Sequence, residues 1–179
     1  EQAIMAYAEQ GERAKTVVLN ETGFLRKFIP HITGTLEDVV GLHESTGFVA
    51  TVAQRMGEQI NETYRQSLGL ERLSLQHVTQ VFLDLQKRIN GDFSVTHEDD
   101  EKIVITGCAC PFGKDVLNRP SLCAMTSNML AVIAAENLGY AKLSMEKSIA
   151  QGDSGCRIVM YLKNTPEAGK AEGREFFQS

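Results

Sequence analysis

Apolar residues recur every three or four positions along two long stretches of the first half of the chain, and this period predicts helices. The first stretch covers residues 44–68 and ends at Gly69, with apolar side chains at Phe48, Val52, Met56, Ile60 and Tyr64. The second covers residues 74–89, between an N-cap at Ser74 and the turn Asn90-Gly91. Its apolar positions are Leu75, Val78, Phe82, Leu85 and Ile89. We therefore expect two amphipathic helices here.

The segment before residue 44 has a weaker pattern. Residues 1–19 predict a helix whose apolar stripe is interrupted by a glycine, at Ile4, Tyr7, Ala8, Gly11, Ala14 and Val18. Such a stripe is typical of a dimer seam or a linker helix, and equally of a helix lying on its own domain. Phe24 to Ile29 predict a short element stopped by Pro30. We assign residues 1–43 to an N-terminal helical segment that serves dimerisation or linkage.

After Gly91 the apolar period changes to two, which is typical of strands. Phe93 and Val95, then Ile103 and Ile105, predict a hairpin around a polar turn. Residues 107–120 form a loop, and Pro120-Ser121 opens a helix that ends at Gly139. A second hairpin follows, with apolar positions alternating over residues 141–146 and 157–162. The stretch 163–179 contains Pro and Gly among charged residues and predicts a flexible tail, although Phe176 and Phe177 in this tail could pack against the domain.

This order of elements predicts an α+β fold, in which N-terminal helices are followed by hairpin, helix and hairpin. The expected sheet has four strands, is mostly antiparallel, and is covered by helices on one face. The domain proper is expected over residues 44–162.

The charge of the chain argues against one class of partner. Its net charge is −5 and its pI is about 5.4, whereas nucleic-acid binding depends on clustered Lys and Arg. Direct nucleic-acid contact by this chain is therefore not expected. No apolar run is long enough to cross a bilayer and no signal-peptide pattern opens the sequence, so we expect a cytoplasmic protein without membrane contact.

Four cysteines fall in the last two fifths of the chain: Cys108, Cys110, Cys123 and Cys156. They are expected at a strand end, in the following loop, in the first turn of the next helix, and at the start of the last strand. Three or four thiolates suit an iron–sulfur cluster or zinc. The spacing Cys-x-Cys-x12-Cys-x32-Cys matches no zinc ribbon and no ferredoxin run. The alternative is that Cys123 and Cys156 are small core residues.

Three motifs around these cysteines resemble a known family: Cys110-Pro111-Phe112-Gly113, Arg119-Pro120-Ser121-Leu122-Cys123, and Gly152-Asp153-Ser154-Gly155-Cys156. The chain resembles the methanogen output domain of microbial signalling proteins. It is also similar to the cysteine-bearing half of SufR-type iron–sulfur repressors and, more distantly, to vinyl-reductase (4VR) ligand-binding domains, whose relatives bind zinc. The resemblance covers roughly residues 44–162 and implies Cys110, Cys123 and Cys156 as ligands. It leaves the fourth ligand open between Cys108, Asp153 and an exogenous molecule.

Our leading hypothesis is a non-enzymatic sensory or regulatory domain that binds an iron–sulfur cluster through Cys110, Cys123, Cys156 and Cys108. It would signal redox, oxygen or iron status, as in transcription regulation, to an effector domain or a partner protein. The alternative is a small-molecule sensor domain with a structural zinc site. An enzyme would need an acid or base that the sequence does not identify. We also expect a homodimer, formed through the stripe in residues 1–19.

Overall fold

The computed structural model describes residues 20–179, so the helix and the apolar stripe expected over residues 1–19 lie outside the described range. The helices are α2 (Glu21–Val40), α3 (Leu42–Leu68), α4 (Leu75–Arg88), α5 (Pro120–Leu138) and the short α6 (Pro166–Lys170). The strands are β1 (Asp92–Glu98), β2 (Lys102–Ala109), β3 (Tyr140–Lys147), β4 (Cys156–Tyr161) and β5 (Arg174–Phe177). Two 3-10 turns, η1 (Gly113–Val116) and η2 (Ile149–Gln151), lie in the loops.

The strands form one antiparallel sheet in the order β1-β2-β4-β3-β5. The predicted α+β class and the two hairpins are confirmed, but the sheet has five strands instead of four. The fifth strand, β5, pairs with β3 and lies in the stretch 163–179 that we expected as a flexible tail. Gly173 makes the pairing possible, because a Cβ at this position would collide with the carbonyl oxygen of Leu143.

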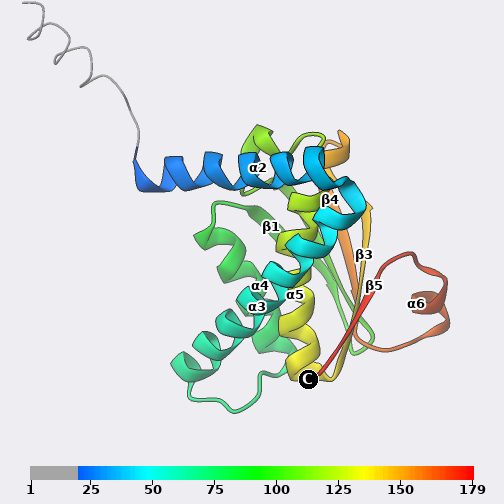
Figure 1. The fold of residues 1–179 in the computed structure, drawn as a ribbon. Helices are drawn as coiled ribbons and strands as arrows, with labels where there is room; N and C mark the ends of the chain where they lie inside the picture. Colours follow the sequence, from blue (N-terminus) through cyan, green and yellow to red (C-terminus); the bar gives the residue numbers. More distant parts are fainter. Residues whose placement is uncertain (1–19) are drawn as a thin grey trace, which may run out of the picture.

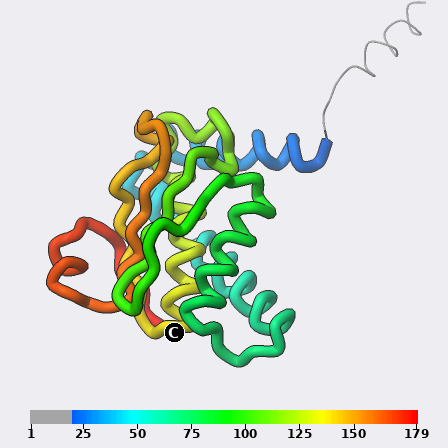
Figure 2. Tube along the Cα trace, turned by 180° about the vertical axis from the view of Figure 1, so that it is seen from behind, coloured from blue at the N-terminus to red at the C-terminus, as the bar shows by residue number. Residues whose placement is uncertain are grey.

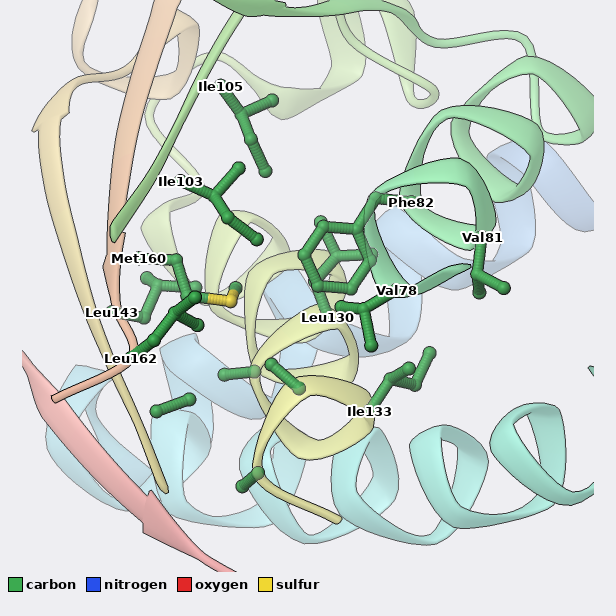
Figure 3. Packing of buried hydrophobic residues seen from close by; sticks show 14 of the residues in the cluster. Val78, Val81, Phe82, Ile103, Ile105, Leu130, Ile133, Leu143, Met160 and Leu162 are labelled. Atoms are coloured by element: carbon green, nitrogen blue, oxygen red, sulfur yellow. The ribbon is translucent and has the colours of Figure 1, made fainter. Parts of the chain in front are cut away.

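The main core lies between the sheet and the helices α4 and α5 (Figure 3). Val78, Phe82, Leu130 and Ile133 come from the helices and form one buried cluster with the sheet residues Ile103, Ile105, Leu143 and Met160. On the opposite face of the sheet, α6 covers a smaller cluster of Val104, Val159 and Tyr161 around Ala168. The helices therefore cover both faces unequally, and the C-terminal segment bulges out beside the sheet before β5 returns to it (Figure 2).

Helix α3 packs on the outer side of α5 (Figure 1). It does so through small residues, because Ala50, Ala53 and Gly57 are buried while the larger Phe48, Val52 and Met56 are exposed. A Cβ on Gly57 would lie 3.0 Å from Cβ of Val132 on α5. The apolar period of α3 thus predicts the helix correctly, but three of the five apolar residues that define this period point away from the core.

Helix α2 does not stop at Pro30, as the sequence led us to expect, but continues to Val40. A proline inside a helix removes one backbone hydrogen bond and destabilises the helix by about 3 kcal/mol. Here Pro30, Thr33 and Gly34 are buried against the rest of the domain, and the Thr33 hydroxyl donates to the carbonyl oxygens of Ile29 and Pro30. Packing thus overrides the local preference.

Over the described range, 20–179, no helix combines the length and the apolar character that crossing a membrane requires.

Candidate functional site

Three of the four cysteines line one small cavity between α5 and the sheet. Cys110 comes from the loop after β2, Cys123 from the first turn of α5, and Cys156 from the first position of β4. The cavity has a volume of about 30 Å³, which is enough to hold at least one water molecule. Its remaining walls are Gln86, Phe93, Pro111, Leu122, Thr126, Ser127, Leu130, Met145 and Ile158. No charged side chain of the described residues lines it.

Cys108 and Asp153, the two protein candidates for a fourth ligand, do not line this cavity. Cys108 is exposed, and its thiol donates to a carboxylate oxygen of Asp92 at 3.0 Å. This hydrogen bond is the main reason why the pKa of the Cys108 thiol is raised. Asp153 accepts a hydrogen bond from the backbone N–H of Ser148 at 2.8 Å. Both residues therefore have other partners outside the cavity.

Short-range contacts position the thiols of Cys123 and Cys156. The Cys123 sulfur lies 3.2 Å from the hydroxyl oxygen of Ser148, and the Ile149 backbone N–H donates to the Cys156 sulfur at 3.5 Å. The loop that carries Cys110 is tied down by Asn118, whose N–H donates to the carbonyl oxygen of Ala150. An apolar cluster of Phe112, Val116, Leu122 and Ala150 packs beneath Cys110 and Cys123.

Burial controls the protonation of two of these thiols. Burial is the main reason why the pKa of Cys110 is raised to about 11, and the neighbouring Cys123 and Cys156 add to this increase. Burial also raises the pKa of Cys156. Both thiols are therefore neutral at neutral pH in the metal-free protein. A bound cation would reverse this, because a coordinating thiol gives up its proton.

The donor set fits a soft metal in kind, but the thiols are not gathered around a common point. Within residues 20–179, no three Cys, His, Asp or Glu side chains are arranged so that they could hold a metal ion. Coordination by Cys110, Cys123 and Cys156 would thus require these side chains to move toward one another. The cavity between them is small, so a cluster of several atoms would have to widen it more than a single ion would.

Gln86 is a cavity residue that the sequence reasoning missed. Its side chain is almost fully buried on α4, and its Oε1 atom has no hydrogen-bond partner among the described residues. An unpaired buried acceptor destabilises a protein by about 1–3 kcal/mol. The signal was present in the sequence, since Gln86 continues the spacing of Val78 and Phe82 and so places an amide at a core-facing position.

A polar contact connects the start of α5, next to the cavity, to α2. The Arg119 guanidinium, at the N-cap of α5, lies 3.0 Å from a carboxylate oxygen of Glu37 on α2. The other carboxylate oxygen of Glu37 accepts a hydrogen bond from the Ser121 hydroxyl. Because Cys123 lies in the same helical turn as Ser121, α2 is held to the element that carries one of the cavity thiols.

The arrangement defines an α+β domain with a five-stranded antiparallel sheet. It is similar to the crystal structure of the phenol-responsive sensory domain of the transcription activator PoxR with phenol, with a TM-score of 0.63 and 12% sequence identity. The match covers 86% of this chain and 80% of that chain. At this identity the similarity concerns the fold.

The chain belongs to the methanogen output domain 1 family, whose sequence model matches residues 28–161. The resemblance to the methanogen output domain is thereby confirmed, and the match begins earlier than expected, within α2. No curated protein matches the chain.

Proposed function

We propose that this domain is the sensory or regulatory part of a signalling protein and that its input site is the cysteine-lined cavity. The observation that carries the proposal is the meeting of Cys110, Cys123 and Cys156, from a loop, a helix and a strand, around one uncharged cavity. Membership of an output-domain family and the fold shared with a sensory domain support a role in signalling. The expected partner is an effector domain or a signalling protein.

The chemistry of the cavity favours a soft metal held by the three thiols. Thiolates prefer zinc and iron–sulfur clusters, whereas Mg²⁺ and Ca²⁺ prefer oxygen ligands. A single zinc ion suits the volume of about 30 Å³ better than the iron–sulfur cluster that led our sequence analysis. When bound, the metal would supply a positive centre that keeps the thiols ionised.

The chain's own residues would then turn binding into a signal. Cys110 would be drawn toward Cys123 and Cys156, and the loop from Cys110 to Arg119 would follow it. Since Arg119 contacts Glu37, the movement would reach α2. The sensor would therefore report occupancy of the cavity through the position of a helix at the N-terminal side of the domain.

The test is the metal and acid-labile sulfide content of protein purified without oxygen, with its absorbance spectrum. We expect about one zinc per chain and no colour, and single replacement of Cys110, Cys123 or Cys156 by Ser should abolish binding. Cys108→Ser is the matched control and should keep the metal. Iron with sulfide and a brown colour would instead indicate the cluster. Protein without metal, and unable to take up added zinc, would contradict a metal site.

A second candidate, direct binding of a small molecule, is favoured by the unpaired oxygen of Gln86. A hydroxyl or N–H group of a ligand would donate to it while the apolar walls contact the rest of the molecule. Phenol is a suitable probe, although the cavity of about 30 Å³ would have to widen to admit it, and toluene is a control of similar size that lacks the hydroxyl. We expect phenol alone to raise the melting temperature of the wild type, and not that of Gln86→Leu. An equal effect of both compounds would contradict a role for Gln86.

A further inference from the structure

Helix α2 carries an apolar face that points away from its own domain. Six of its large apolar side chains are between 39% and 76% exposed, at Phe24, Leu25, Phe28, Ile32, Val39 and Val40. Its buried residues, Pro30, Thr33 and Gly34, lie on the side of the helix opposite Phe28, Ile32 and Val39, as the 100° rotation per residue requires. In Figure 1 the first half of α2 also extends beyond the body of the domain. Soluble monomers rarely expose apolar faces of this kind without a binding role.

The shape of this face suits another helix. Phe24, Phe28, Ile32, Leu36 and Val40 follow one another at intervals of four and form a ridge along α2. A second row at the same interval contains His31, Thr35 and Val39. Phe28, Ile32 and Leu36 of the first row, with all three residues of the second, line an open groove of about 450 Å³. In the commonest class of helix packing, the i+4 ridge of one helix enters such a groove of the other at about −50°.

We propose that this groove receives α2 of a second copy of the chain, so that α2 forms the interface of a homodimer. The face is self-complementary, because α2 supplies both the ridge and the groove, as a two-fold interface requires. The five exposed apolar side chains on this face, Phe24, Leu25, Phe28, Ile32 and Val39, would contribute roughly 400–500 Å² per copy, taking about 80–100 Å² for each. A standard interface buries about 800 Å² per partner, of which somewhat more than half is apolar. The apolar area of α2 is therefore sufficient.

The charged residues of α2 lie outside the apolar face. Arg26 and Asp38 are each six residues from Ile32, so they lie about 120° to either side of it around the helix, and Asp38 lies 3.7 Å from Arg119 of its own chain. The proposed contact between the two copies is therefore apolar. The interface differs from the one we expected over residues 1–19, and it lies on the helix that contacts Arg119 beside the cysteine-lined cavity.

The experiment is sedimentation equilibrium of the full chain between about 1 µM and about 100 µM, a range that reveals micromolar dissociation constants. We expect a dimer for the wild type and at least a 100-fold weaker dimer for Ile32→Glu, because a carboxylate would be buried without a partner. Leu68→Glu is the matched control: Leu68 is as exposed as Phe28 but lies at the far end of α3. This variant should dimerise like the wild type. Circular dichroism of each variant checks that the fold is kept.

A second substitution in the groove separates this interface from contacts elsewhere on the chain. Phe28→Glu should weaken the dimer as Ile32→Glu does, because Phe28 lines the same groove. A monomeric wild type at the highest concentration would overturn the proposal and would leave residues 1–19 or another protein as the occupant. A dimer that survives Ile32→Glu would overturn it as well, because the contact would then lie elsewhere. Neither outcome depends on whether the cavity binds metal.

Discussion

At the scale of single residues, the cavity is lined by polar groups that burial deprives of hydration. Cys110 and Cys156 have raised pKa values because their thiolates would lose hydration without gaining a positive partner. Gln86 likewise brings a polar atom into an apolar site without pairing it. Such groups destabilise the folded protein when no ligand is bound, and they are common at sites where a ligand supplies the missing interaction.

The raised pKa of Cys110 predicts a pH dependence of stability in the metal-free protein. The thiol ionises near pH 9 in the unfolded chain and near pH 11 in the folded one. Its contribution is therefore fully present below pH 9 and is lost as the pH rises toward 11. Since Cys110 is only partly buried, we expect a loss of about 1 kcal/mol, less than the full linkage value.

Urea unfolding at several pH values checks this expectation through the difference between the wild type and Cys110→Ala. The difference in the free energy of unfolding should change between pH 9 and 11. Thr126→Val alters another cavity wall without removing a titrating group, so its free energy of unfolding should follow the same pH dependence as that of the wild type. The same pH dependence for Cys110→Ala and the wild type would show that the thiol has the same pKa in the folded and unfolded states.

At the scale of elements, the close approach of α3 to α5 depends on a missing side chain. Gly57→Leu would push against Val132 and the carbonyl oxygen of Met129, so we expect a destabilisation of about 1–3 kcal/mol in urea unfolding. Gly47 lies in the same helix with open space around it. Gly47→Ala should therefore stabilise the protein by about 0.5–1 kcal/mol. Equal effects of both substitutions would contradict the described packing of α3.

The contact of α2 with the start of α5 rests on a largely buried carboxylate. Glu37 has 9% of its side chain exposed, and Arg119→Ala would leave it with the Ser121 hydroxyl alone. We expect a loss of about 1–3 kcal/mol in urea unfolding, because a buried charge would lose its partner. Arg157→Ala removes an exposed ion pair with Glu146 and should change stability by less than about 1 kcal/mol. If both substitutions have the same small effect, α2 is not held by this contact.

At the scale of the whole molecule, the sequence predicts the parts whose signals are local. Helix α4 and the two hairpins follow from apolar periods, and α4 also has its cap at Ser74. The cysteine positions follow from the element boundaries. The sequence did not predict strand β5, because four residues are too few to show an alternation of apolar and polar side chains and because its pairing with β3 is a long-range contact.

The features that sequence reasoning could not place depend on tertiary packing. The continuation of α2 through Pro30 depends on burial against distant residues. The outward position of Phe48 on α3 depends on small residues meeting α5. The meeting of three cysteines in one cavity, without Cys108, depends on the direction of side chains at the end of β2. A linear pattern contains none of this information.

The most direct test of the account is hydrogen exchange of the metal-free protein with and without added zinc. Binding should slow exchange in residues 107–126 and 152–157, which carry the three thiols, and in the second half of α2, which contacts Arg119. Helix α4 should change little, and Cys110→Ser should show none of these changes. Identical exchange in these segments with and without zinc would contradict the claim that the cysteine-lined cavity is the input site of a sensor.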